Sequence, residues 1–220
     1  MALNTLIFDM DGLLIDSEPL WEEAGQETLQ YYGATLSAPE YNITTGLRTK
    51  EWIEYWFEHF KIDKKHAAEA GNRIVKLAIE KIDAQAIGLP GVDHIFRFFR
   101  EKNFRIGIAT SSPVELIDVV TEKLSIRALL DGFSSAEDLD YGKPHPQVYL
   151  NCAIELGTSP LGCVCFEDSV NGMIAAKAAR MKCVVIPHSA LADDKRFGLA
   201  DLQLSSLLDF TDYQLDLLMN

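Results

Sequence analysis

Two aspartates close a short apolar run near the start of the sequence. The run Thr-Leu-Ile-Phe at 5–8 is followed by Asp9, Met10, Asp11 and Gly12. In a strand, residues i and i+2 point to the same side, so Asp9 and Asp11 could direct two carboxylates into one small volume, where they would favour a cation. An Asp-x-Asp-Gly turn at a strand end explains the same residues without chemistry. Other residues must therefore distinguish a site from a turn.

Polar residues with matching chemistry follow later apolar runs. They are Thr110, Ser111, Lys143, Glu167 and Asp168. Ligands of an open parallel sheet bind beyond the carboxyl ends of its strands, and the predicted order of elements places each of these residues at such an end. Carboxylate oxygens suit Mg²⁺, which can also take a substrate phosphate oxygen. Lys143, the Thr110 hydroxyl and the backbone N–H groups of the following turn could bind an anion. The combination predicts a phosphate site beside Mg²⁺.

Carboxylates with unequal roles would complete a reaction at this site. One that stays ionised can attack phosphorus and form an aspartyl-phosphate. Another can donate a proton to the leaving alcohol and then accept one from water. Dividing the reaction in this way suits phosphate monoesters, whose hydrolysis requires rate factors approaching ~10²¹.

The elements that would position these residues alternate between strands and helices. Short apolar runs typical of buried parallel strands occur at 5–8, 104–109, 132–135, 163–166 and 183–186. Helical patterns follow at about 91–101, 113–123, 146–156 and 170–180. The alternation indicates βαβ units and predicts an α/β fold with a Rossmann-like parallel sheet.

The first connection is much longer than the others. Roughly 100 positions separate Asp11 from Thr110, whereas a single βα crossover takes about 30 residues. About 70 residues are therefore inserted after the first strand. We expect an α-helical cap domain at 15–84 and a catalytic core made of 1–14 and 85–220. The cap would open to admit substrate and close over the site.

The inserted segment has three helical patterns. They cover 17–32, where Ser17 is a possible N-cap, then the aromatic-rich stretch 49–60, and 64–82. The spacing of the aromatic residues suits one buried helix face. We therefore expect this stretch to form the core of the cap and not a ligand-binding box.

Composition restricts the class of protein and its partners. The chain has 220 residues, of which 48% are hydrophobic and 24% charged, as in ordinary globular proteins. Its net charge of −13 argues against nucleic acid or an anionic membrane as partner. No run approaches the roughly 18 apolar residues of a membrane span. We expect a cytoplasmic monomer that acts on a small phosphorylated metabolite, with its four cysteines reduced in the core.

Four short motifs carry a resemblance to a known family. They are Phe8-Asp9-Met10-Asp11-Gly12, Thr110, Lys143-Pro144 and Glu167-Asp168. In order and spacing they are similar to the motifs of the haloacid dehalogenase-like hydrolases, over essentially the whole chain. The resemblance implies a Mg²⁺-dependent phosphatase in which Asp9 is the nucleophile and Asp11 the general acid/base.

The same resemblance assigns the binding residues. It implies that Thr110, the Ser111 amide and Lys143 hold the phosphate group. It implies a metal site in which Asp9 and Asp168 bind Mg²⁺, the main-chain carbonyl of Asp11 also contacts it, and Glu167 supports it.

Longer runs narrow the resemblance within the family. Residues 9–21, 143–149 and 167–173 resemble bacterial phosphatases of hexitol phosphates and 2-deoxyglucose 6-phosphate, in the helical-cap, β-phosphoglucomutase-like branch. β-Phosphoglucomutases usually carry histidine at the position of Trp21, so the resemblance favours hydrolysis. Asp11 argues against the dehalogenase branch, which lacks an equivalent carboxylate. A phosphomutase and a non-catalytic phosphometabolite-binding protein remain alternatives.

Three residues of the predicted cap are candidates for substrate binding. Arg48 lies in a glycine-containing loop and could pair with a phosphate or line the sugar pocket, or it could be a surface charge. Glu18 and Trp21 open the first cap helix and could face the substrate, or they could pack at the hinge.

Overall fold

A six-stranded parallel sheet forms the centre of the protein. The structure is a computed structural model that describes residues 3–44 and 47–219. The strands are β1 (Thr5–Phe8), β2 (Arg105–Thr110), β3 (Gly132–Ser135), β4 (Cys163–Glu167), β5 (Lys182–Val185) and β6 (Leu202–Gln203). Their order is β3-β2-β1-β4-β5-β6, and every neighbouring pair is parallel. The predicted α/β fold with a Rossmann-like sheet is confirmed, and β6 is an addition.

Strand β1 lies between β2 and β4 and is buried on both faces. Leu6 and Phe8 belong to one apolar cluster, and Ile7 belongs to the cluster on the opposite side. Phe8 stacks on Phe96 with ring centroids 5.0 Å apart. A strand covered on both faces needs a continuous apolar sequence, which is why this run does not alternate with polar residues.

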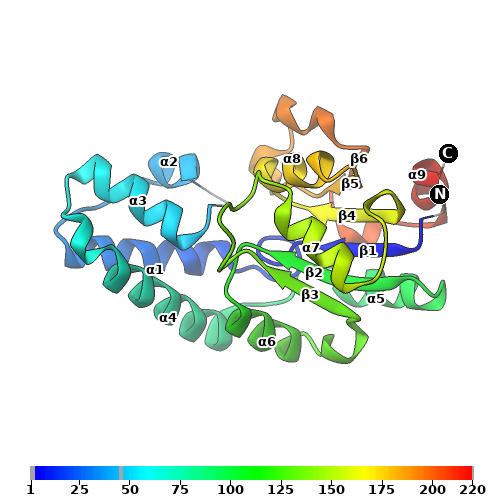
Figure 1. The fold of residues 1–220 in the computed structure, drawn as a ribbon, viewed down its shortest axis with the longest axis horizontal. Coiled ribbons are helices and arrows are strands. Elements are labelled where there is room, and N and C mark those ends of the chain that lie inside the picture. The colour runs from blue at the N-terminus through cyan, green and yellow to red at the C-terminus, as the bar shows by residue number, and fades with distance from the viewer. Residues whose placement is uncertain (1–2, 45–46, 220) are drawn as a thin grey trace.

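Five helices cover the two faces of the sheet (Figure 1). They are α5 (Val92–Glu101), α6 (Val114–Lys123), α7 (Gln147–Glu155), α8 (Val170–Ala178) and α9 (Asp212–Met219). Buried residues of α5, α6 and α9 share a cluster with Phe8, and those of α7 and α8 share one with Ile7. The four cysteines are free and buried, as expected. Within 3–44 and 47–219, no helix is both long and apolar enough to cross a membrane.

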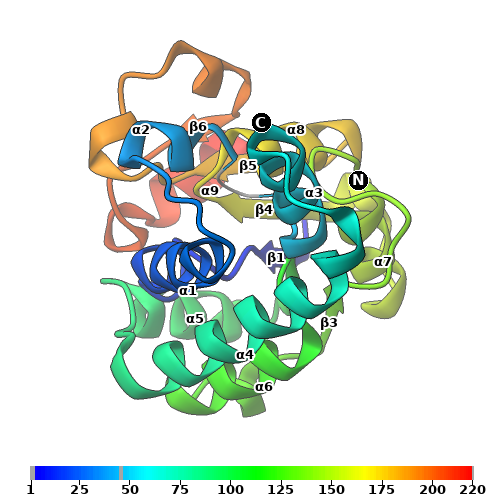
Figure 2. The same ribbon diagram turned by 90° about the vertical axis from the view of Figure 1, so that its left-hand side faces the viewer.

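The segment after β1 forms further helices beyond the carboxyl ends of the strands. They are α1 (Glu18–Tyr31), α2 (Ala38–Tyr41), α3 (Thr49–Phe60) and α4 (Ala67–Gln85). Figures 1 and 2 show them together on one side of the sheet. The helix predicted at 64–82 begins as a 3₁₀ turn at Lys64–His66 and continues to Gln85. Trp52, Trp56 and Phe57 are buried, so this part of the aromatic stretch packs in a core as expected, but Trp52 also lines the pocket described below.

Candidate active site

The predicted site residues meet at the carboxyl edge of the sheet. Asp9 directly follows β1, Thr110 ends β2, Lys143 lies in the loop after β3, and Glu167 ends β4. All four are buried. A parallel sheet brings the carboxyl ends of its strands to one edge, so residues far apart in sequence share one small volume.

Lys143 binds two carboxylates at the floor of the site. Its Nζ lies 2.5 Å from Oδ1 of Asp9 and 2.6 Å from Oε1 of Glu167. It also donates to the carbonyl oxygen of Ala109 at 3.1 Å. Burial alone would lower the pKa of Lys143, but the two carboxylates raise it above its usual range. The ammonium group is therefore a permanent charge beside Asp9.

The Glu167 carboxylate is saturated with hydrogen bonds. Oε1 accepts from Lys143 and from the Tyr149 hydroxyl at 2.6 Å. Oε2 accepts from the backbone N–H groups of Asp168 and Ser169, both at 3.2 Å, and from the Ser169 hydroxyl at 3.0 Å. A carboxylate offers about four lone-pair sites, so these donors hold Glu167 in one position. The role of Tyr149 was not predicted, because nothing in the sequence around it distinguishes it from a core residue.

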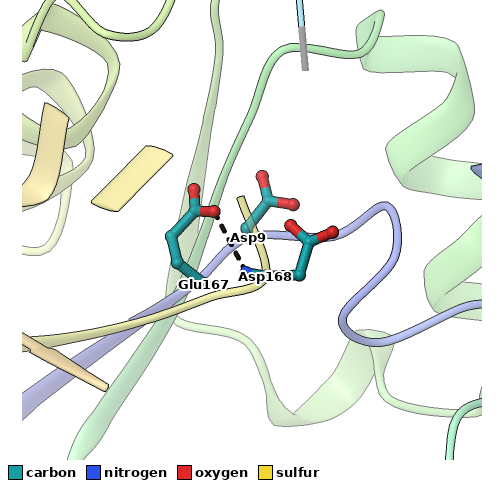
Figure 3. A group of neighbouring side chains, drawn as sticks. All are labelled: Asp9, Glu167 and Asp168. Atoms are coloured by element: carbon teal, nitrogen blue, oxygen red, sulfur yellow. Dashed lines mark hydrogen bonds between the residues drawn. The ribbon is translucent and has the colours of Figure 1, made fainter. Parts of the chain in front are cut away.

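Three carboxylates could hold a metal ion. One ligand atom each from Asp9, Glu167 and Asp168 lies within 4.8 Å of the other two (Figure 3). Hard oxygen donors of this kind fit Mg²⁺. Because the Glu167 oxygens already accept several hydrogen bonds, Asp9 and Asp168 are the residues that would contact an ion directly. This arrangement fits the predicted division between direct ligands and a supporting glutamate.

Burial and nearby charges disfavour the ionised forms of Asp9 and Asp168. Burial raises the pKa of Asp9 well above its usual range, Glu167 and Asp11 add to the rise, and Lys143 opposes it. Burial, followed by the charges of Glu167, Asp9 and Glu18, also raises the pKa of Asp168. A bound cation would offset the repulsion among these carboxylates and favour their ionised forms.

Asp11 is held by a separate set of donors. Its Oδ1 accepts from the Ser17 hydroxyl at 2.7 Å and from the indole N–H of Trp21 at 2.9 Å. Its Oδ2 accepts from the Ser112 hydroxyl at 2.7 Å and from Thr110 Oγ1 at 3.4 Å. Ser17 does precede the first helix, but its side chain does not cap it, because the hydroxyl is used on Asp11. Ser17 was predicted only as an N-cap, and Ser112, which follows the second predicted strand, was given no role.

A pocket of about 80 Å³ lies between the sheet edge and the inserted helices. Asp9, Asp11, Lys143 and Asp168 line it, as do the predicted substrate-binding residues Glu18, Trp21, Arg48, Thr110 and Ser111. The Ser111 hydroxyl is buried and has no hydrogen-bond partner in the described structure. A second cavity of about 480 Å³ shares Arg48, Thr49 and Ser111 with this pocket.

Arg48 lines the pocket and uses both of its Nη groups elsewhere, whereas its buried Nε has no hydrogen-bond partner among the described residues. Its Nη1 donates to the carbonyl oxygens of Ala136, at 3.0 Å, and Leu139, and its Nη2 donates to that of Asp140 at 3.3 Å. Nη2 also forms a 2.6 Å ion pair with Glu51. Binding of substrate phosphate by Arg48 stays a prediction, and the observed contacts instead join the inserted helices to the loop that leads to Lys143.

Glu18 lies at the pocket wall near other acids. Burial, followed by the charges of Asp11, Glu22 and Asp16, raises its pKa to about 7. In the parts of the chain that the structure describes, no hydrogen bond to its carboxyl group is found. It is therefore placed to accept or donate a hydrogen bond to a ligand.

Comparisons with known proteins identify the family of the chain. The model of the haloacid dehalogenase-like hydrolase family matches residues 3–180. Hexitol phosphatase B of Escherichia coli (strain K12) is 43% identical over 206 residues, which cover 93% of each chain. A probable pseudouridine-5'-phosphatase of Drosophila melanogaster is 31% identical, with 96% of this chain and 93% of that protein covered.

Solved structures share the fold. The crystal structure of β-phosphoglucomutase from Clostridium difficile has a TM-score of 0.87 at 21% identity and covers 98% of this chain and 96% of its own. CbbY from Rhodobacter sphaeroides, solved in complex with phosphate, has a TM-score of 0.85 at 24% identity and covers 94% and 96%. At these identities the likeness shows the fold alone. From the family match and the curated relatives, the chain belongs to the haloacid dehalogenase-like hydrolases.

Proposed function

We propose that the protein is a Mg²⁺-dependent phosphatase that hydrolyses small sugar or sugar-alcohol phosphates through an aspartyl-phosphate on Asp9. The observation that carries this proposal is the position of Asp9, 2.5 Å from the Lys143 ammonium group, in a pocket that Asp11 also lines. A nucleophile beside a fixed cation and a second carboxylate is the arrangement that two-step phosphate transfer needs. The names of the curated relatives support phosphate monoesters as substrates.

Asp9, Asp11 and Lys143 take different roles in the reaction. A carboxylate oxygen of Asp9 attacks phosphorus, the bond from phosphorus to the ester oxygen breaks, and Asp11 gives its proton to the departing alkoxide. Asp11 then accepts a proton from water as that water attacks the phosphoryl group, which releases inorganic phosphate and restores Asp9. Lys143, with Thr110 beside it, stabilises the charge on the phosphoryl oxygens. Mg²⁺, when held by Asp9 and Asp168, would supply further charge neutralisation.

The cations of the pocket favour a hydrolase over a phosphomutase. A mutase that works through a bisphosphate must bind two phosphoryl groups in one site. Among the described residues that line the pocket, the cationic side chains are Lys143 and Arg48. Lys143 serves the Asp9 end, and the Nη groups of Arg48 are bound by Glu51 and three backbone carbonyl oxygens, which leaves only its Nε without a partner. No further cation is therefore placed to take a second phosphoryl group within the described pocket.

The sugar or sugar-alcohol part of the proposal has separate support. The hexitol phosphatase B relative covers almost the whole chain. A second relative, from Thermotoga maritima, is named a phosphorylated carbohydrates phosphatase and is 28% identical. The pocket wall opposite Asp9 comes from the inserted helices, so those helices would contact the alcohol part of the substrate.

The test compares the wild-type protein with Asp9→Asn on p-nitrophenyl phosphate in Mg²⁺. We expect phosphate release by the wild type and at least a ~10³-fold lower rate in the variant, because an amide cannot form the phosphoenzyme. Asp118→Asn removes a carboxylate that is paired with Arg127 at the surface, and it should leave turnover unchanged. Equal rates for Asp9→Asn and the wild type would refute the mechanism. Absence of phosphate release by the wild type from any phosphorylated metabolite would favour the binding-protein alternative.

A further inference from the structure

Within the described part of the chain, the indole N–H group of Trp52 has no hydrogen-bond partner. Trp52 is the fourth residue of α3, is only 7% exposed and lines the same pocket as Asp9. The other two tryptophans of the chain are satisfied, since Trp21 donates to Asp11 and Trp56 donates to Thr44 Oγ1 at 3.0 Å. An unsatisfied buried donor costs roughly 1–3 kcal/mol. Trp52 therefore holds a buried donor without a partner in a side chain that lines this pocket.

The ring of Trp52 occupies a prepared position. It lies against Gly25 in the middle of α1, where an added Cβ would be only 3.0 Å from Cη2 and 3.1 Å from Cζ2. Glycine inside a helix is about 1 kcal/mol less favourable than alanine. Tyr41 borders the ring on another side, with centroids 6.3 Å apart. The glycine in α1 leaves room for the indole at a cost in helix stability. The close contact restricts the position of the ring and therefore of its N–H group.

A second polar group without a partner lies in the same pocket wall. Glu18 opens α1, lines the pocket, and receives no hydrogen bond within the described residues. A carboxyl group can bond to a hydroxyl whether or not it is protonated. Trp52 can only donate and so needs an acceptor oxygen, whereas Glu18 can take a hydroxyl hydrogen. A ligand with several hydroxyl groups satisfies both requirements.

We propose that Trp52 and Glu18 determine substrate specificity by hydrogen-bonding hydroxyl groups of the leaving alcohol, which makes the pocket selective for phosphates of polyhydroxylated alcohols. This inference rests on the proposed phosphatase function. A phosphate ester of the same length without hydroxyls would leave both groups unsatisfied on closure, and sites of that kind reject such analogues strongly.

The kinetic test uses two esters of equal carbon number, a hexitol 6-phosphate and n-hexyl phosphate. We expect the wild type to prefer the hexitol ester. Trp52→Phe should lower kcat/KM for that ester about 3- to 10-fold, as expected for the loss of one neutral hydrogen bond, and leave kcat/KM for n-hexyl phosphate nearly unchanged. Glu18→Leu, which removes both oxygens, should reduce the preference for the hexitol ester over n-hexyl phosphate. Trp56→Phe is the matched control, because its indole bonds inside the inserted helices, and it should keep the wild-type preference.

A binding measurement covers the case in which Trp52→Phe does not fold. In ¹⁵N-tryptophan-labelled Asp9→Asn protein, the Trp52 indole signal should shift on addition of the hexitol ester and much less with n-hexyl phosphate, while the Trp56 signal stays in place. The inference is overturned if the wild type shows no preference between the esters, or if Trp52→Phe and Trp56→Phe change both esters alike. If the wild type hydrolyses neither ester nor p-nitrophenyl phosphate, the proposed function itself fails.

Discussion

The indole N–H of Trp21 donates to Oδ1 of Asp11 at 2.9 Å, and this bond ties the first inserted helix to the proposed general acid/base. Trp21→Phe should lower kcat about fivefold and change KM little, because a neutral hydrogen bond contributes about 1 kcal/mol and the remaining donors keep Asp11 in place. Trp21→His restores a ring N–H and should recover part of the rate. Steady-state kinetics on a phosphate ester would measure both, and a Trp21→Phe variant with wild-type kcat would contradict the assignment.

Gly172 in α8 leaves the space that Glu167 fills. A Cβ at this position would lie 1.8 Å from Oε1 and 2.0 Å from Cδ of Glu167, which is fully buried. Gly172→Ala should therefore lower the free energy of unfolding by about 2 kcal/mol and reduce activity, since the displaced carboxylate can no longer hold Lys143. Urea denaturation gives the first quantity. Gly198→Ala, which has open space around it, should behave like the wild type.

Arg48 should control the loop that precedes Lys143. Arg48→Lys keeps the charge but loses the planar set of donors that reaches three carbonyl oxygens. We expect a loss of about 2 kcal/mol in the stability of this contact, hence about 30-fold faster amide exchange in residues 136–142. KM for a phosphate ester should rise at the same time. Arg127→Lys, at an exposed ion pair, is the control, and equal exchange in the two variants would refute the role.

Glu18 gives the stability of the metal-free protein a defined pH dependence. Burial and nearby acids raise its pKa from 4.5 to about 7, so the folded protein binds this proton more tightly than the unfolded chain. The contribution of Glu18 to stability is complete below pH 4.5 and is lost as the pH rises to about 7. Glu18→Gln has no such ionisation, so its free energy of unfolding should exceed that of the wild type by an amount that grows to about 3 kcal/mol as the pH rises from 4.5 to about 7. Unfolding in EDTA would test this, and a constant difference between the proteins would contradict it.

The central strands could be predicted from the sequence because they are buried on both faces. Such strands are continuous apolar runs, and those of β1 and β4 stand out between polar turns. The strand at Gly132–Ser135 was predicted as well, although its apolar run is weak. Strand β6 was missed because Leu202–Gln203 is too short to show any period. Helix α9 was missed because only Leu215 and Leu218 of its eight residues are buried.

The residues of the candidate site could be predicted from the sequence, but their hydrogen-bond partners could not. Motif spacing located Asp9, Lys143 and Glu167, since parallel topology alone brings strand ends together. The sequence could not show that the Arg48 side chain would bind backbone carbonyl oxygens, because every residue carries such an oxygen and no residue type marks the partner. It also could not assign the Ser17 hydroxyl to Asp11, because a serine before a helix is ordinarily a cap. The extent of the cap domain, 15–84, stays a prediction.

The contacts of Arg48 have a consequence for sequence variation. Its acceptors at positions 136, 139 and 140 are main-chain atoms, which every amino acid supplies. Mutations that keep the backbone path of that loop can therefore accumulate without loosening the attachment. Tolerance to substitution should be high on the loop side and low at Arg48 and at its partner Glu51, so the two halves of one contact are expected to evolve at different rates.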